Sequence, residues 1–173
     1  MKNYIPLHVH SHYSLLDGLS KPEQIANRCN KIGVNSCAIT DHGSISGAVQ
    51  MYLALKAKNI KPILGCELYL AFNDSCIKTK ENIKLTHFLV LAKNLEGWKN
   101  LIKIVSASNN EENYYRKPRL SIDKLKDLVT GKNLISFCGH MGSYLPDLIE
   151  QHPDNYKKHC LSFIDEMKDI FGK

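Results

Sequence analysis

Long apolar runs, paired-cysteine motifs and blocks of like charge are all missing from this 173-residue chain. No apolar run approaches the roughly 20 residues that span a bilayer, so we expect no membrane association. The N-terminus reaches a polar, histidine-rich segment within a few residues, so no signal peptide is expected. There is also no internal repeat or low-complexity tract. The composition, 43% hydrophobic and 23% charged, is typical of one soluble globular domain, and we assign residues 1–173 to a single domain.

The six cysteines show no CxxC spacing and do not form the framework of a small secreted scaffold. A chain of this length buries a sizeable core without covalent staples. We therefore interpret the cysteines as reduced, mostly buried thiols, which predicts a cytoplasmic protein.

The chain carries a formal net charge of +6, but its lysines are spread along the sequence. Such a spread is most often a solvated surface. It is also compatible with an anionic substrate or nucleic acid. The charge therefore supports a phosphate-handling function without establishing one.

Short apolar segments alternate with segments of helical spacing. The spacing of Ile25 and Cys29 predicts a helix over residues 21–32, with Pro22 near its start and Gly33 after its end. This alternation predicts an α/β fold with a parallel sheet, in which active-site groups gather at the carboxyl ends of strands. The predicted strands are residues 5–10, 36–40, 63–70, 88–91 and 134–137; the further helices are residues 44–55, 95–107, 121–129, 143–151 and 154–170, with long loops at 73–84 and 109–118.

Histidines and carboxylates recur in or just after these strands. His8 and His10 are two residues apart, so a strand projects both to the same face. The complete set of candidate ligands is His8, His10, Asp17, His42, Glu67, His87 and His140. This set exceeds the needs of one ion, because zinc is usually four-coordinate, and imidazole with carboxylate also suits manganese or iron. We expect two or three divalent ions (zinc, manganese or iron, with magnesium a further candidate) that clamp a phosphate and activate water.

Simpler explanations exist for single members of this set. His8 and His10 alone would fit an exposed surface strand, and His87 alone a strand-edge histidine. His42 could begin a helix that Asp41 caps. Glu67 is different, because a carboxylate in an apolar run is costly unless it is paired or binds metal.

Three other histidines carry weaker signals. His152 and His159 lie in predicted surface helices and are expected to face solvent. His12 shares the face of His8 and His10 only if the first strand continues that far.

Two stretches closely resemble the PHP (polymerase and histidinol phosphatase) family: residues 8–18, HVHSHYSLLDG, and residues 38–43, AITDHG. Further stretches are similar to the branch of the family found at the amino terminus of bacterial DNA polymerase III α subunits. They are residues 60–67 (IKPILGCE), 87–94 (HFLVLAKN), 97–101 (GWKNL) and 117–119 (KPR). The resemblance covers essentially the whole chain.

The resemblance implies a distorted (β/α)7 barrel with a trinuclear metal site. The family's ligands carry over onto His8, His10, Asp17, His42, Glu67 and His87. Asp41 matches a position that orients a ligand histidine and is a candidate catalytic residue. A cation such as Arg119 is a second candidate, for neutralising substrate charge.

The chain departs from the polymerase pattern in two places. The family segment after the fifth strand ends in a ligand cysteine, which Cys138 matches at first sight. The register of Leu134 and Leu145 instead places His140 there, and we favour His140 as the ligand. A final Asp-x-His pair of the family is also absent, so we expect an incomplete barrel of about five strands. The polymerase's own catalytic aspartates are absent as well.

The leading hypothesis is metal-dependent phosphoester hydrolysis, in the polymerase context a 3′–5′ exonuclease for proofreading. Its partners would be a DNA 3′ end or another phosphoester, and the remainder of the α subunit. A non-catalytic module that docks a proofreading subunit is the second hypothesis, which the missing Asp-x-His favours. A free-standing histidinol-phosphatase-like enzyme is the third.

Overall fold

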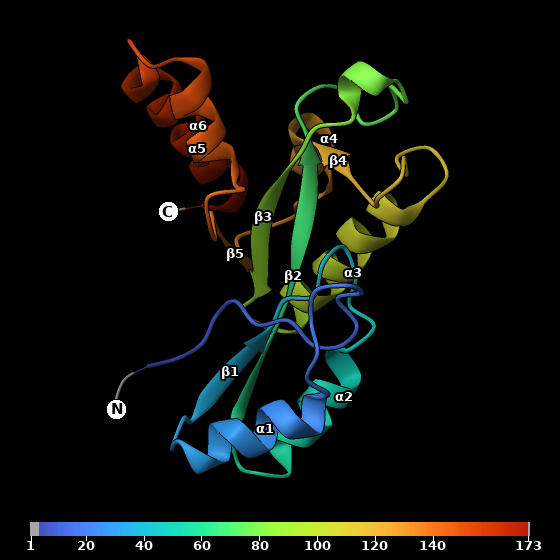
Figure 1. The fold of residues 1–173 in the computed structure, drawn as a ribbon, viewed down its shortest axis with the longest axis vertical. Helices are drawn as coiled ribbons and strands as arrows, with labels where there is room; N and C mark the ends of the chain where they lie inside the picture. The colour runs from blue at the N-terminus through green and yellow to red at the C-terminus, as the bar shows by residue number, and fades with distance from the viewer. Residues whose placement is uncertain (1–3, 173) are drawn as a thin grey trace.

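One long strand organises the fold of residues 4–172, the part of the chain that the computed structural model describes. This strand is β2 (Lys61–Ala71). It pairs in parallel with β1 (Ser36–Ile39) at its start and with β4 (Leu120–Ser121) at its end. β3 (Leu85–Ala92) runs antiparallel to the second half of β2, and β5 (Leu134–Phe137) runs antiparallel to β3. The order is β1-β2-β3-β5, and the sheet is not closed within the described residues (Figure 1). An α/β fold whose mixed parallel and antiparallel sheet is not closed agrees with the expected incomplete barrel.

The prediction of a parallel sheet is wrong for β3. Parallel neighbours need a crossover connection, usually a helix, whereas antiparallel neighbours do not. The connection between β2 and β3 contains only the short 3₁₀ helix η1 (Lys80–Asn82). The chain therefore turns back beside β2. The long loop predicted at residues 73–84 lies in this connection.

The predicted first strand, residues 5–10, does not form a regular strand and bends at His8. It lies along β1, where Ala38 N–H donates to the Pro6 carbonyl and Thr40 N–H to the Val9 carbonyl, each at 2.9 Å. Pro6 has no N–H to return, and Val9 N–H donates to the Thr40 hydroxyl at 2.9 Å instead of to a carbonyl. The segment still reaches the edge of the sheet, which is what places His8 and His10.

Two helices cover β1. α1 (Pro22–Lys31) begins with proline in its first turn and ends before Gly33, as the sequence predicts. α2 (Ala48–Lys56) begins four residues later than predicted, and residues 46 and 47 form a turn before it. The two helices lie together beside β1 at one end of the molecule in Figure 1. Their buried side chains form a small separate core with those of β1 and of the segments that follow the two helices: Ala26, Cys29, Val34, Cys37, Ile39, Met51, Leu55 and Ile60.

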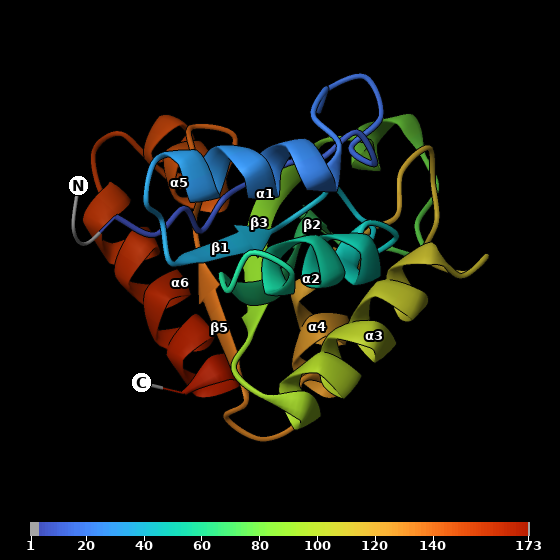
Figure 2. The same ribbon diagram turned by 90° about the horizontal axis from the view of Figure 1, so that it is seen from below.

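Four helices enclose the larger core on β2 and β3. They are α3 (Leu95–Asn109), α4 (Ile122–Leu128), α5 (Tyr144–Gln151) and α6 (Tyr156–Phe171). Asn94 caps α3 by accepting from Gly97 N–H at 2.9 Å. Figure 2 shows α6 alongside β5. The two elements are in contact, and their buried side chains belong to the same core as Phe88 of β3. No helix within residues 4–172 is long and apolar enough to cross a membrane. All six cysteines are free thiols.

Candidate metal centre

The candidate centre is built around the carboxylate of Glu67. This side chain lies in β2 and is 0% exposed, yet both of its oxygens meet imidazole nitrogens. Oε2 lies 2.7 Å from His8 Nε2 and 2.8 Å from His10 Nε2. Oε1 lies 2.8 Å from His87 Nδ1 and 2.9 Å from His140 Nε2. The structure thus brings together residues that are far apart in the sequence: His140 is 73 positions from Glu67, and its ring stacks on that of His8.

Backbone pairing fixes most of these positions. His42 lies three residues after the end of β1 and forms a parallel bridge with Glu67, so the two side chains meet beside the sheet. His87 lies near the start of β3, where it is paired with Tyr69, two residues beyond Glu67. Its antiparallel direction, rather than the carboxyl end of a parallel strand, is what brings His87 to the centre.

The loop that carries His140 is held against the start of β3. His87 N–H and the Thr86 hydroxyl both donate to the Gly142 carbonyl, at 2.9 and 3.1 Å. Gly142 N–H in turn donates to His140 Nδ1 at 2.9 Å. The proton of a neutral His140 is therefore on Nε2, where it can donate to Glu67 Oε1.

Asp17 reaches the centre from the loop after residue 14. Its Oδ2 lies 3.2 Å from His42 Nε2 and 3.8 Å from His10 Nδ1, and its side chain is 55% exposed. Gly18 makes this loop possible, because a Cβ there would lie 1.9 Å from the Ser11 carbonyl oxygen. Asp17 is thus an accessible carboxylate on the open side of the centre.

These side chains line an open cleft of about 410 Å³ and could hold metal ions. Three groups each have ligand atoms within 4.8 Å of one another: His8, His10 and Glu67; His10, Asp17 and His42; and His42, Glu67 and His87. His42 Nδ1 is buried and makes no hydrogen bond. A bound ion would satisfy this nitrogen. Imidazole and carboxylate donors suit zinc, manganese or iron.

Electrostatics favour a charged Glu67. Burial alone would raise the pKa of Glu67, but hydrogen bonds from His10, His87, His8 and His140 outweigh it and hold that pKa far below its ordinary value. Burial lowers the pKa of His10, yet its contact with Glu67 raises it overall. For His42 the balance is opposite: burial and the neighbouring imidazoles lower its pKa. The carboxylate thus stays negative among groups that must be deprotonated to bind metal.

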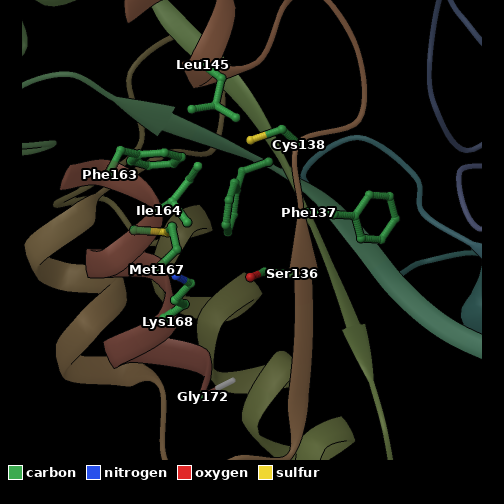
Figure 3. A pocket seen from close by; sticks show the side chains of 10 residues that line it. Ser136, Phe137, Cys138, Leu145, Phe163, Ile164, Met167, Lys168 and Gly172 are labelled. Atoms are coloured by element: carbon green, nitrogen blue, oxygen red, sulfur yellow. The ribbon is translucent and has the colours of Figure 1, made fainter. Parts of the chain in front are cut away.

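Cys138 and His140 line different pockets. Cys138 lines an apolar pocket of about 390 Å³ between β5 and α6, and its sulfur points toward Leu145 and Phe163 (Figure 3). Burial raises the pKa of the Cys138 thiol, which disfavours the thiolate that binds metals. His140 lines the metal cleft. It nevertheless belongs to none of the three groups above, and its side chain is 41% exposed.

Asp41 is buried just outside the cleft lining. Its carboxylate accepts from Ser11 N–H at 2.7 Å, from the Ser11 hydroxyl at 2.8 Å and from the Ser14 hydroxyl at 2.7 Å. The carboxylate forms no hydrogen bond with a histidine, but Ser14, which sequence reasoning did not identify, links it to His10. The other three histidines, His12, His152 and His159, do not line the cleft.

Arg119 is not brought to the cleft, and the expectation that it neutralises substrate charge is corrected. Its side chain is 0% exposed, and the guanidinium donates to the carbonyl oxygens of Asn113, Asn82, Ser75 and Ile77. A group enclosed in this way cannot contact a substrate. It instead ties the β2–β3 connection to the loop before β4.

Lys117, two residues earlier, lies nearer to the metal cleft. Its ammonium is 3.2 Å from the Tyr69 hydroxyl and 4.4 Å from the centroid of the Tyr69 ring. That ring lies 5.5 Å from the ring of His42 and 5.0 Å from that of His87. Gly43 allows the neighbouring Pro118 to approach, because a Cβ on Gly43 would lie 2.4 Å from it. Sequence reasoning noted the KPR motif but named the buried Arg119, and not the exposed Lys117, as its candidate cation.

The fold and the cluster define a class, and comparison of the whole sequence agrees with it: the chain belongs to the PHP domain family, whose model matches residues 6–173. Curated relatives named DNA polymerase III subunit alpha are 41% identical in Borreliella burgdorferi, 38% in Helicobacter pylori and 36% in Treponema pallidum. Each alignment covers 98% of this chain and 14% of the relative. The chain therefore spans about one seventh of the length of these relatives.

Two solved structures are more distantly similar. One is an amidohydrolase from Chromobacterium violaceum, with 21% identity, a TM-score of 0.45, and coverage of 60% of this chain and 32% of that one. A candidate metal-dependent phosphoesterase from Bifidobacterium adolescentis gives 19% identity, a TM-score of 0.44 and the same coverage. Values this low assign no substrate to the present chain.

Proposed function

We propose that this chain is the PHP domain of a DNA polymerase III α subunit and that its cleft is a metal-dependent phosphoesterase site acting on DNA 3′ ends. The observation that carries the chemistry is the Glu67 carboxylate, buried in β2 while imidazoles contact both of its oxygens. The polymerase context rests on the named relatives, which align with nearly the whole chain. The proposed substrate, a DNA 3′ end, combines the phosphoesterase chemistry with the polymerase context.

In this proposal His8, His10, Asp17, His42, Glu67, His87 and His140 hold two or three divalent ions, with zinc, manganese and iron favoured by the donor types. When bound, such ions supply water activation and charge neutralisation at a phosphate.

The chain's own residues contribute in two further ways. Glu67 joins neighbouring ligand groups, because its two oxygens face different histidines. Lys117, exposed at the side of Tyr69, attracts the phosphate anion toward the cleft.

Hydrolysis assays with added Mn²⁺ or Zn²⁺ test the proposal. We expect turnover of a DNA oligonucleotide from its 3′ end, loss of turnover in His10→Ala, and no loss in His152→Ala, which changes a histidine outside the cleft. If no tested phosphoester is cleaved faster than by His10→Ala, the enzymatic proposal is wrong for this chain. Cleavage of histidinol phosphate alone would instead support the free-standing phosphatase.

A non-catalytic docking module is the second candidate. It is favoured by an exposed apolar groove of about 520 Å³ between α2 and the start of α3, lined in part by Tyr52, Leu64 and Trp98. Metal analysis of the purified protein separates the two candidates, because a pure docking module predicts no stoichiometric metal. The enzymatic proposal predicts two or three bound ions, and far fewer in His10→Ala.

A further inference from the structure

The chain reverses sharply in the loop before β4 and presents an aromatic ring and two cations there. Tyr115 N–H donates to the Lys117 carbonyl at 3.3 Å, which closes a tight turn. Tyr114, Arg116 and Lys117 are all exposed, and Tyr114 is 45% accessible. Neither cation forms an ion pair with a carboxylate among residues 4–172. The 114–117 turn therefore offers a stacking face and two free positive charges to solvent.

The backbone of Arg116 is strained within this turn. Its φ of 62° lies in the left-handed region, which side chains other than those of glycine, asparagine and aspartate rarely adopt. Folding alone would favour glycine here. The guanidinium lies over the Tyr115 ring, 5.8 Å from its centroid, which is a weak contact at an exposed site. The strain therefore points to a use for the exposed cation itself.

Hydrogen bonds hold the turn in place. The side-chain amide of Asn109 donates to the Gly43 carbonyl at 3.1 Å, which ties the loop to the segment that carries the cleft ligands. The Tyr114 hydroxyl donates to the Arg116 carbonyl at 3.2 Å, which fixes the ring across the turn. A ring that is already fixed loses little conformational entropy when a ligand stacks on it.

A series of contacts connects the turn to the metal cleft. The Lys117 ammonium lies 3.2 Å from the Tyr69 hydroxyl. The Tyr69 ring in turn stacks on that of His42, with centroids 5.5 Å apart. His42 lines the cleft. A nucleic-acid strand whose terminal phosphodiester lies at the cleft would thus pass Lys117 and reach Arg116 and Tyr114.

We infer that the 114–117 turn binds single-stranded DNA: Tyr114 stacks on a base, and Arg116 and Lys117 contact backbone phosphates. Aromatic rings combined with cations suit single strands, because every base has a face that can stack and every nucleotide carries a phosphate. In a duplex the bases are stacked on one another and leave no free face for the ring. The inference rests on the proposed function, since it places the nucleotides next to the bond that the cleft would hydrolyse.

Fluorescence anisotropy with a 5′-labelled oligothymidine measures this binding without turnover, because EDTA keeps the protein metal-free. We expect Tyr114→Ala to weaken binding about 5- to 100-fold, the range for losing one stacked base, and Tyr114→Phe to keep most of the affinity. Tyr156→Ala is the matched control, because exposed Tyr156 precedes the exposed Lys157 and Lys158 but lies outside the cleft. An equal loss in Tyr156→Ala, or no loss in Tyr114→Ala, would overturn the inference.

Salt dependence tests the two cations separately from the ring. Each phosphate contact of a single strand contributes about 0.7 to the slope of log affinity against log salt concentration. Arg116→Gly and Lys117→Ala should each lower that slope by about 0.7, whereas Tyr114→Ala should leave it unchanged. Arg116→Gly should also keep or raise the free energy of unfolding, because glycine adopts this φ without strain. An unchanged slope in both cation variants would refute the phosphate contacts.

Duplex DNA and turnover complete the test. A blunt duplex should bind more weakly than the oligothymidine, and Tyr114→Ala should not change its affinity. The same loss for duplex and single strand would contradict base stacking. If binding depends on the turn but no phosphoester is cleaved, only the enzymatic part of the proposed function fails. Cleavage of single-stranded DNA with unchanged KM in Tyr114→Ala would instead refute the inference and leave the proposed function standing.

Discussion

Glu67 and Arg119 are both 0% exposed, yet they are stabilised in different ways. The guanidinium of Arg119 is surrounded by carbonyl oxygens, which are neutral and always present. The carboxylate of Glu67 is surrounded by imidazoles, which can bind either protons or metal ions. A buried charge costs several kcal/mol unless its surroundings compensate it. The comparison teaches that burial alone does not distinguish a candidate metal-site charge from a structural one. The distinction lies in the partners, because imidazoles can exchange a proton for a metal ion and carbonyl oxygens carry no proton to exchange.

The largest expected effect follows from removing the structural charge. Arg119→Ala would leave several buried carbonyl groups without donors, so we expect the free energy of unfolding to fall by about 3 kcal/mol or more. Denaturant unfolding measures this loss, and exposed Arg28→Ala serves as the control. The Mn²⁺ affinity of the protein that remains folded should be unchanged. A large loss of affinity there would mean that Arg119 does serve the metal centre.

Glu67→Gln should show the opposite pattern. The amide keeps the size of the side chain but loses the charge that attracts metal ions, so the Mn²⁺ affinity should fall by about 100-fold or more. The free energy of unfolding should change by only about 1 kcal/mol, because the neighbouring imidazoles can remain neutral. Calorimetric titration and denaturant unfolding test the two parts, with exposed Glu112→Gln as the control. Equal stability losses in Glu67→Gln and Arg119→Ala would remove the distinction between them.

His140 and Cys138 test the same distinction between a metal-site residue and a structural residue, with smaller expected effects. His140→Ala should weaken Mn²⁺ binding about 10-fold, less than Glu67→Gln, because His140 is half-exposed and outside the tight ligand groups. Cys138→Ala should leave the affinity unchanged and lower the free energy of unfolding by about 1 kcal/mol through the enlarged apolar pocket. The reverse result, with affinity lost only in Cys138→Ala, would restore the cysteine as the ligand.

The smallest effect is expected for Lys117. If this residue supplies the accessible positive charge that Arg119 cannot, Lys117→Ala should raise KM for a phosphodiester about 3- to 10-fold with little change in kcat. The effect should shrink as salt is added, because the ammonium is exposed. Steady-state kinetics at two salt concentrations test this, with the exposed Lys58→Ala as the control. A fall in kcat without a change in KM would contradict a role in substrate attraction.

Much of the fold could be read from local patterns. The helices at residues 22–31, 95–109 and 122–128 and the strand at 134–137 lie close to their predicted positions, because each has apolar spacing and clear end signals. The direction of β3 could not be read in this way, since strand direction depends on the connection and not on the strand's own residues. The two-residue strand β4 gave no periodic signal at all.

The candidate site shows the same division. The sequence by itself determined which residue types recur in or just after the predicted strands, and so nominated all seven residues that line the cleft. Periodicity and motif spacing are local properties, and they suffice for that purpose. Only the tertiary structure decided that Arg119 is enclosed, that the sulfur of Cys138 points into an apolar pocket, and that Ser14 connects Asp41 to His10. Those outcomes depend on side-chain direction and on contacts between distant segments, which become fixed only when the sheet and its loops pack together.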